Sequence, residues 1–336
     1  MITRRSWLKQ MGGAATLSLL DVAGRAQTPP ATDAVMQLGW IWNVEYAGEF
    51  MALENNYYRA GGLNLDVRPG GPQVDEIVTI MSHKALVCVS DVMTSSQAAN
   101  HGAKVKIIGS TFQKAPFAIT SLPGKPIRTP HDLIGKTIGV PSKQLWALKF
   151  LCLANKINSA DLTIVPVGYD PAPLVNLQVD GCLTFVTNEP VQLAHQGVET
   201  VSMLFVDFGL AEFSDCLVVR EDALNDPAQR SVIKAIVSGT IRGWQDAVNQ
   251  PEVAAKKLVV RFGGQYGLNE SVQLKTLQAQ IPLIVTPESK KNGLLSMSEE
   301  DIAANIATLG RVGVPVSRDL FDTTLIGEVM AGHLPG

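Results

Sequence analysis

Short apolar runs alternate with helical patterns along the chain from Val35 onward, and this alternation limits the possible folds more than any other feature. The run at residues 35–40 is followed by Tyr46, Phe50 and Leu53, whose spacing places them on one face of a helix. Residues 85–89 are apolar throughout, which is typical of a central strand covered by helices on both sides. The pattern predicts an α/β protein built on parallel sheets with crossover helices.

The chain of 336 residues is long enough for two domains. A strand predicted at residues 117–122 runs into the turn-forming segment Pro123-Gly124-Lys125-Pro126, where we expect the chain to cross into a second domain. A loop rich in Asp, Gly and Phe after residue 206 indicates the return crossing. We therefore predict a first domain of residues 33–122 plus 218–336 and a second domain of residues 123–217, joined by two crossings.

The first 26 residues contain, in order, the regions of an export signal. Arg4 and Arg5 precede an apolar stretch at residues 11–20, which is too short to span a bilayer. Gly24 and Ala26 provide the small residues that a cleavage site after Ala26 requires. We predict a twin-arginine-type signal peptide at residues 1–26 and a periplasmic location. The alternative is a basic tail on a cytoplasmic protein.

The composition excludes some classes of partner. Apolar residues make up 46% of the chain, charged residues make up 18%, and the formal net charge is −3. These values argue against disorder and against a polyanion-binding surface, so nucleic acid is not an expected partner. The cysteines are widely spaced and contain no Cys-x-x-Cys motif. We expect buried small hydrophobic residues at Cys88, Cys152, Cys182 and Cys216.

Enzyme motifs are scarce in this sequence. Gly135-Lys136-Thr137 is similar to the end of a phosphate-binding loop, but Pro130 occupies the position where that loop needs a glycine. The histidines are scattered and lack the spacing of metal ligands. The sequence therefore predicts no catalytic residues, no metal site and no cofactor.

Polar and aromatic residues follow several predicted strands. In open α/β sheets, ligands bind beyond the carboxyl ends of the strands. The candidate ligand-binding residues at such positions are Trp40, Trp42, Asn43, Tyr46, Ser90, Asp91, Phe112, Asn188, Glu189 and Asp207. Several have a structural alternative: Ser90 and Asp91 are also suited to cap a helix, and Trp40 is equally suited to the core. Asn188 and Glu189 would also serve to begin a helix before Pro190.

The strongest candidates are Trp42, Asn43 and Tyr46. At one strand end they offer a flat stacking surface together with hydrogen-bond donors and acceptors, which favours a planar heterocyclic or aromatic ligand. Glu189 follows a strand of the predicted second domain. A ligand that contacts both sets of residues would favour a closed arrangement of the domains.

Several segments of the sequence resemble a known family. Residues 39–52, with Gly62-Leu63 and Gly70-Gly71, resemble the opening of the thiamine-precursor and alkanesulfonate (SsuA-like) family of ABC transporter substrate-binding proteins. Residues 132–140 are similar to the segment by which that family enters its second domain. The resemblance covers nearly the whole predicted mature chain, and its motifs are specific for the family but weak for the ligand.

The resemblance implies a type II periplasmic binding protein fold and a partner, the ABC transporter permease at the membrane. It implies capture of a small molecule such as a thiamine pyrimidine precursor, with a sulfonate, nitrate, riboflavin or an aromatic acid as alternatives. In pyrimidine binders an aromatic residue stacks on the ligand and a carboxylate contacts its amino group, roles that Trp42, Asn43, Tyr46 and Glu189 would fill here. We also expect a monomer.

The same superfamily contains an enzyme, the eukaryotic-type thiamine pyrimidine synthase, which has a cysteine-rich iron motif. This sequence has no clustered cysteines, and its predicted export signal would remove it from cytosolic pyridoxal phosphate chemistry. The synthase is therefore the less favoured alternative to a binding protein.

Overall fold

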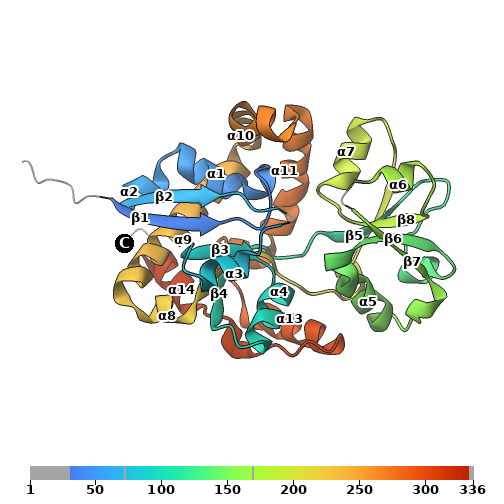
Figure 1. The fold of residues 1–336 in the computed structure, drawn as a ribbon. Helices are drawn as coiled ribbons and strands as arrows, with labels where there is room; N and C mark the ends of the chain where they lie inside the picture. Colours follow the sequence, from blue (N-terminus) through green and yellow to red (C-terminus); the bar gives the residue numbers. More distant parts are fainter. Residues whose placement is uncertain (1–30, 72, 169, 333–336) are drawn as a thin grey trace, which may run out of the picture. The chain divides into compact units, whose positions relative to one another are not determined.

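The computed structural model describes residues 31–71, 73–168 and 170–332 (Figure 1). The predicted signal peptide at residues 1–26 lies outside the described residues. The described chain forms two five-stranded sheets, each with its own helices. Within these residues, no helix combines the length and the apolar character needed to cross a membrane.

The first sheet has the strand order β2-β1-β3-β10-β4. Its strands are β1 (Thr32–Gln37), β2 (Leu63–Arg68), β3 (Val87–Ser90), β4 (Val105–Phe112) and β10 (Ser214–Arg220). β1 pairs in parallel with β2 and β3, whereas β10 runs antiparallel to β3 and β4. Every residue of β3 and β10 is buried, as expected for the centre of a sheet that is covered on both faces.

The second sheet has the order β7-β6-β8-β5-β9. Its strands are β5 (Phe117–Ser121), β6 (Thr137–Pro141), β7 (Thr163–Val167), β8 (Gly181–Phe185) and β9 (Val201–Leu204). β6 pairs in parallel with β7 and β8, and β5 is antiparallel to β8 and β9. The prediction of two α/β domains is confirmed, but both sheets are mixed rather than wholly parallel.

Helices connect the strands of both sheets and extend the C-terminal half of the chain. They are α1 (Ala47–Glu54), α2 (Tyr57–Ala60), α3 (Glu76–Met81), α4 (Val92–Asn100), α5 (Leu145–Ala154), α6 (Ala172–Val175), α7 (Glu189–His195), α8 (Glu221–Asn225), α9 (Pro227–Asn249), α10 (Pro251–Tyr266), α11 (Glu270–Ile284), α12 (Pro287–Asn292), α13 (Glu299–Arg311) and α14 (Thr324–Ala331). Short 3₁₀ turns that matter for the site are η1 (Val44–Tyr46), η3 (Ser142–Gln144) and η5 (Val206–Phe208).

The chain passes from the first sheet to the second between β4 and β5, and it returns between β9 and β10. The first passage thus lies before Phe117, earlier than the predicted boundary between residues 122 and 123. The proline-rich segment that indicated a crossing instead ends β5 in a local turn, in which the Lys125 N–H donates to the Leu122 carbonyl oxygen at 3.0 Å. The predicted boundary between residues 217 and 218 falls within β10, which belongs entirely to the first sheet.

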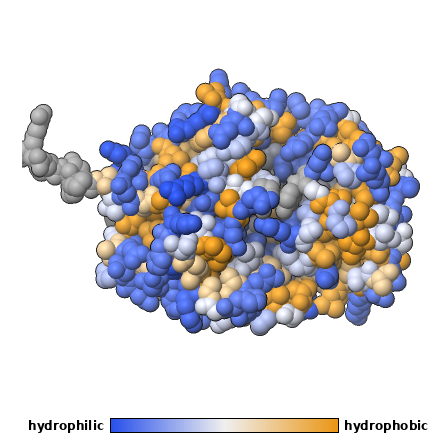
Figure 2. All heavy atoms as spheres, viewed as in Figure 1, coloured by the Kyte–Doolittle hydropathy of each residue, from blue (hydrophilic) through white to orange (hydrophobic). Residues whose placement is uncertain are grey.

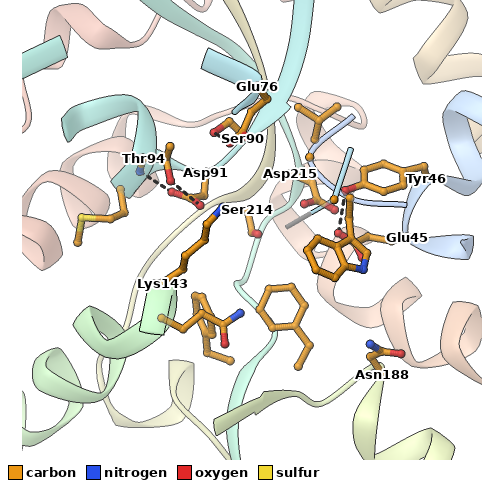
Figure 3. Close-up of a pocket in the computed structure, with 18 of the residues that line it drawn as sticks. Glu45, Tyr46, Glu76, Ser90, Asp91, Thr94, Lys143, Asn188, Ser214 and Asp215 are labelled. Carbon is orange, nitrogen blue, oxygen red and sulfur yellow. Dashed lines mark hydrogen bonds between the residues drawn. The ribbon is translucent and has the colours of Figure 1, made fainter. Parts of the chain in front are cut away.

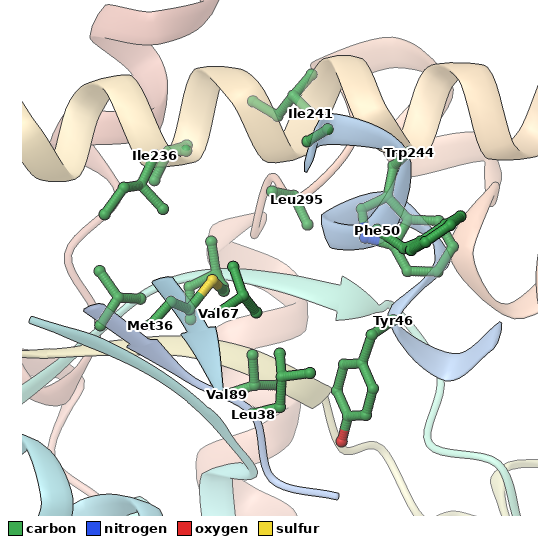
Figure 4. Packing of buried hydrophobic residues seen from close by; sticks show 14 of the residues in the cluster. Met36, Leu38, Tyr46, Phe50, Val67, Val89, Ile236, Ile241, Trp244 and Leu295 are labelled. Atoms are coloured by element: carbon green, nitrogen blue, oxygen red, sulfur yellow. The ribbon is translucent and has the colours of Figure 1, made fainter. Parts of the chain in front are cut away.

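Hydrophobic clusters fill both faces of the first sheet. Val87 and Val89 point into the cluster shared with α1 and α9, whereas Cys88 belongs to the cluster on the opposite face (Figure 4). α1 and α9 approach closely because Gly243 has no side chain; a Cβ atom there would collide with the Gly48 carbonyl oxygen. This contact fixes α1, and with it the turn η1 that leads into α1.

The four cysteines are buried, as the sequence predicted, and they are free thiols in the described residues. Burial raises the pKa of the Cys88 thiol well above its ordinary value, so the thiol stays protonated. On the outside of the molecule, hydrophilic residues cover most of the face in Figure 2, with smaller apolar groups among them.

Candidate functional site

A cavity of about 440 Å³ is lined by residues from both sheets and their connecting turns. The ends of β1, β3 and β10 meet it from the first domain, and the ends of β5 and β8 meet it from the second. Its volume lies in the range of about 300 to 1,000 Å³ that is usual for small-molecule sites. This position, outside the ends of the strands, is where the sequence predicted a ligand.

Six of the ten predicted site residues line this cavity, and four do not. The six are Trp40, Tyr46, Ser90, Asp91, Asn188 and Glu189. The remaining four, which lie elsewhere, are Trp42, Asn43, Phe112 and Asp207. Contact of the first six with a ligand stays a prediction.

Trp42 is a core residue, contrary to the role expected of it as a ligand platform. Its side chain is 3% exposed and stacks on Phe262 of α10, with ring centroids 4.9 Å apart and planes at 7°. Tyr46 and Phe50 meet the same indole edge-on. The stacking surface of Trp42 is therefore occupied by the protein itself.

The other three displaced candidates also have structural positions. Asn43 caps η1, because its Oδ1 accepts the Glu45 backbone N–H at 2.6 Å. Phe112 is buried in the hydrophobic cluster of the first domain. Asp207 lies exposed in η5, on the return between the sheets. A position after a strand was insufficient to place these side chains in the cavity.

The turn that Asn43 caps carries Glu45 and Tyr46, which both line the cavity. The Tyr46 hydroxyl donates to Glu45 Oε1 at 3.1 Å (Figure 3). Burial raises the pKa of Glu45 to about 7, opposed by the hydrogen bonds from Tyr46 and Asn43. Glu45 was not among the predicted site residues, although it lies between two of them in the sequence.

Asp215 lies beside Glu45 and Tyr46 on the same wall of the cavity (Figure 3). It is 9% exposed, and its Oδ2 has no hydrogen-bond partner among the described residues. Its backbone has a φ of 50°, a left-handed conformation that Asp adopts at a cost. Burial, and after it the neighbouring Glu45 carboxyl, raise the pKa of Asp215 well above its ordinary value.

Further along this wall, the acidic side chains have local partners. Asp91 caps α4, accepting the Thr94 backbone N–H at 2.5 Å and the Thr94 hydroxyl at 3.0 Å. The Ser90 hydroxyl donates to Glu76 Oε1 at 2.7 Å. Burial raises the pKa of both Asp91 and Glu76. The structural alternative for Asp91 is thus correct, and the residue lines the cavity as well.

The second domain provides an aromatic wall. Phe117 meets Trp146 edge-on with ring centroids 5.5 Å apart, and it meets Phe185 edge-on at 5.0 Å. Lys143, in η3, is the single basic side chain among the described residues that line the cavity. It extends toward Asp91 and Ser214 of the first domain (Figure 3).

Glu189 and Asn188 begin α7 and line the cavity at the same time. Glu189 Oε2 accepts the Phe185 backbone N–H at 2.9 Å, and Asn188 Oδ1 accepts from the Gln192 side chain at 2.8 Å. Burial raises the pKa of Glu189 to about 7. The structural alternative, that this pair begins a helix, is therefore correct, and both residues also line the cavity.

Comparison with known proteins places these features in a family. A sequence profile described as NMT1/THI5 like matches residues 43–254. The riboflavin-binding protein RibY of Chloroflexus aurantiacus is 25% identical over 266 residues, which cover 76% of this chain and 73% of RibY. The formylaminopyrimidine-binding protein of Halalkalibacterium halodurans is 22% identical over 298 residues, covering 85% of this chain and 89% of that protein.

Solved structures share the fold at low identity. The alkanesulfonate-binding protein SsuA from Xanthomonas axonopodis pv. citri, bound to MOPS, has a TM-score of 0.63 and 15% identity, covering 88% of this chain and 97% of SsuA. The desulfurization enzyme DSZB has a TM-score of 0.58 and 12% identity, covering 90% of this chain and all of that chain (100%). The fold is that of periplasmic binding proteins, and with a profile matching more than half of its residues this chain belongs to the NMT1/THI5-like family.

Proposed function

We propose that this protein is the exported substrate-binding component of an ABC importer, and that it captures a small planar heterocycle with an amino group, such as a thiamine pyrimidine precursor. The observation that supports this most strongly is the composition of the cavity. One wall presents aromatic rings and the other presents carboxyl groups, and the two walls come from different domains.

Each wall supplies one part of the recognition. Phe117, Trp146 and Phe185 offer ring edges and faces between which a flat ligand would be held. Carboxyl oxygens accept hydrogen bonds from amino groups, and Tyr46 adds a hydroxyl. A ligand that contacts both walls would stabilise the closed arrangement, with movement at the two passages between the sheets, and a transporter would recognise that closed form.

The similar proteins favour this class of ligand. Both curated relatives bind nitrogen-containing ring compounds, riboflavin in one case and formylaminopyrimidine in the other. The carboxyl-rich wall argues against the alternatives from the sequence, because a sulfonate, nitrate or aromatic acid would be repelled by it. The predicted signal peptide at residues 1–26 supports export to the periplasm through the twin-arginine route.

The proposal is tested by identifying what the protein carries and what it delivers. Mass spectrometry after gentle denaturation of the purified protein is expected to release a planar, amino-bearing compound. Adding the loaded protein to vesicles that contain its permease and ATPase should stimulate ATP hydrolysis and uptake of that compound. Release of a sulfonate or an aromatic acid, or loaded protein that leaves the importer unstimulated, would contradict the proposal.

The enzymatic alternative is favoured by one observation, the shared fold of DSZB, which is an enzyme. A synthase that forms the thiamine pyrimidine would show pyridoxal absorbance and consume one of its own histidines. A binding protein instead shows a ligand-dependent rise in melting temperature without turnover. Following absorbance and intact mass during incubation with pyridoxal phosphate separates the two functions.

A further inference from the structure

We infer that Asp215 and Glu45 form an anchor for a positively charged nitrogen group, so that the ligand is a cation at the end that enters the first domain. This inference rests on the proposed function and makes its ligand class more specific. An amino group on a neutral ring can donate two hydrogen bonds but carries no charge, whereas two adjacent carboxylates require a compensating charge.

The charge of the cavity is the first argument. Six carboxyl side chains line it, and Lys143 is the single basic one among the described lining residues. The carboxyl groups are those of Glu45, Asp75, Glu76, Asp91, Glu189 and Asp215. Lys143 extends toward the Asp91 end of the cavity, which leaves Glu45 and Asp215 without a basic neighbour on the cavity wall (Figure 3).

The state of Asp215 is the second and independent argument. Most acidic groups of the wall are satisfied locally: Asp91 caps α4, and Glu76 accepts from Ser90. Asp215 is nine-tenths buried, yet its Oδ2 has no partner among the described residues. A buried polar atom without a partner lowers the stability of the fold. The left-handed backbone of Asp215 lowers it further. Residues that destabilise the fold in this way are concentrated at binding sites, which supports a ligand-binding role for Asp215.

The surroundings of Asp215 make a cation the best partner. Glu45 and Tyr46 lie against it from η1, the buried Glu49 lies behind them in α1, and Asp91 faces it from the start of α4. These groups add negative potential, and the Tyr46 hydroxyl already donates to Glu45. Without a ligand, protons neutralise the pair. A cationic group would replace these protons and donate hydrogen bonds to both carboxylates.

The test uses three probes with the same ring and different charge: benzamidinium, benzamide and benzoate. Calorimetric titration at a pH above 8 ionises Glu45, whose pKa is about 7, while the amidinium stays protonated. We expect benzamidinium to bind in the millimolar range or better, as its size allows. We expect it to bind at least roughly tenfold more tightly than benzamide, with benzoate weakest.

The variant Asp215→Asn keeps the size of the side chain, and Asn tolerates a left-handed backbone. It is expected to lower benzamidinium affinity roughly tenfold while changing benzamide affinity about twofold or less. The ligand-free variant should melt at the same temperature as the parent or higher, because an unpartnered buried carboxyl has been removed. Asp161→Asn, an exposed aspartate of the second domain, is the matched control and should change neither.

Three outcomes would overturn the anchor: absence of benzamidinium binding, equal affinity for benzamide, or an Asp215→Asn variant that keeps the preference for benzamidinium. A strong loss of stability in Asp215→Asn would indicate a structural role and would also contradict it. If any of these outcomes is found but the copurified ligand still binds, the anchor is wrong and the proposed function stands. If the parent protein carries and binds no small molecule, both fail.

Discussion

The two walls of the cavity are built from different chemistry. The first domain contributes the carboxyl groups of five residues, of which Asp215 is the most buried, together with Trp40 and Tyr46. The second domain contributes three aromatic rings in edge-to-face contact, with Lys143 and Glu189 at their margins. The comparison indicates that one wall responds to the charge of a ligand and the other to its flatness. Substitutions in each wall should therefore have distinguishable effects.

The largest expected effect concerns the core residue Trp42, which lies behind the carboxyl wall of the first domain. Trp42→Ala removes a fully packed indole that stacks on Phe262, and we expect the free energy of unfolding to fall by about 3 to 5 kcal/mol. Urea denaturation measures this loss. Benzamidinium affinity, measured where both proteins are folded, should be nearly unchanged because Trp42 lies behind the wall.

Trp40→Ala is the matched comparison two residues away, at a half-buried position on the cavity. Its free energy of unfolding should fall less than that of Trp42→Ala, and its benzamidinium affinity should fall more. The opposite order for the two variants would return Trp42 to the ligand-contacting role that the sequence predicted.

The second prediction concerns the pH dependence of the carboxyl wall. Burial raises the pKa of Glu45 from 4.5 to about 7 in the folded protein, so the folded state binds a proton more tightly than the unfolded state. The stability contributed by this group is present below about pH 4.5 and is lost as pH rises through 7. The loss is at most about 3 to 4 kcal/mol, since one pKa unit corresponds to about 1.4 kcal/mol.

Melting temperatures of the ligand-free protein from about pH 5 to pH 8 measure this loss. Glu45→Gln should flatten the decline, whereas Glu252→Gln, an exposed glutamate in α10, should leave it as in the parent. Glu49, Glu189 and Asp215 titrate nearby with raised pKa values, so some decline will remain in Glu45→Gln. A profile that is steeper in this variant than in the parent would contradict the assignment.

Much of the fold was readable from the sequence because periodicity and strand ends are local signals. The alternation of strands and helices predicted two α/β domains, and the ends of β1, β3 and β8 gave Trp40, Ser90, Asp91, Asn188 and Glu189 as cavity residues. Strand pairing was less readable: the sequence of β5 does not reveal that its neighbours are β8 and β9. The early passage between domains was missed for that reason.

The site was predicted less completely because side-chain direction depends on distant residues. Trp42 turns inward because Phe262 of α10, far along the chain, provides its stacking partner. Asp215 reaches the wall through a left-handed backbone within β10, and the sequence around it has no glycine or turn signal that would predict this conformation. Phe117 lies on the wall because β5 belongs to the second sheet, and the sequence alone did not indicate this.

A third prediction examines the one carboxyl group that the aromatic wall carries. Glu189→Gln keeps the shape of the side chain and an oxygen that accepts from Phe185, but removes the charge. We expect benzamidinium affinity to fall, but by less than the roughly tenfold loss expected for Asp215→Asn, because Glu189 lies on the wall opposite the anchor. Titration calorimetry with benzamidinium and benzoate measures the change. An unchanged affinity for benzamidinium would mean that Glu189 serves α7 alone, and tighter binding of benzamidinium would contradict the cationic ligand class.

The smallest expected effect belongs to the aromatic wall itself. Trp146 is half-buried on the cavity and meets Phe117 edge-on, so Trp146→Ala removes one surface for a flat ligand. Affinity should fall by about 1 kcal/mol, or about fivefold, for benzamidinium and benzamide alike, because ring contacts are indifferent to the charge of the substituent. Trp146→Phe should recover most of the loss. A loss confined to benzamidinium would mean that Trp146 binds the cation through its ring face, and the division of the cavity into a wall for charge and a wall for flatness would then be wrong.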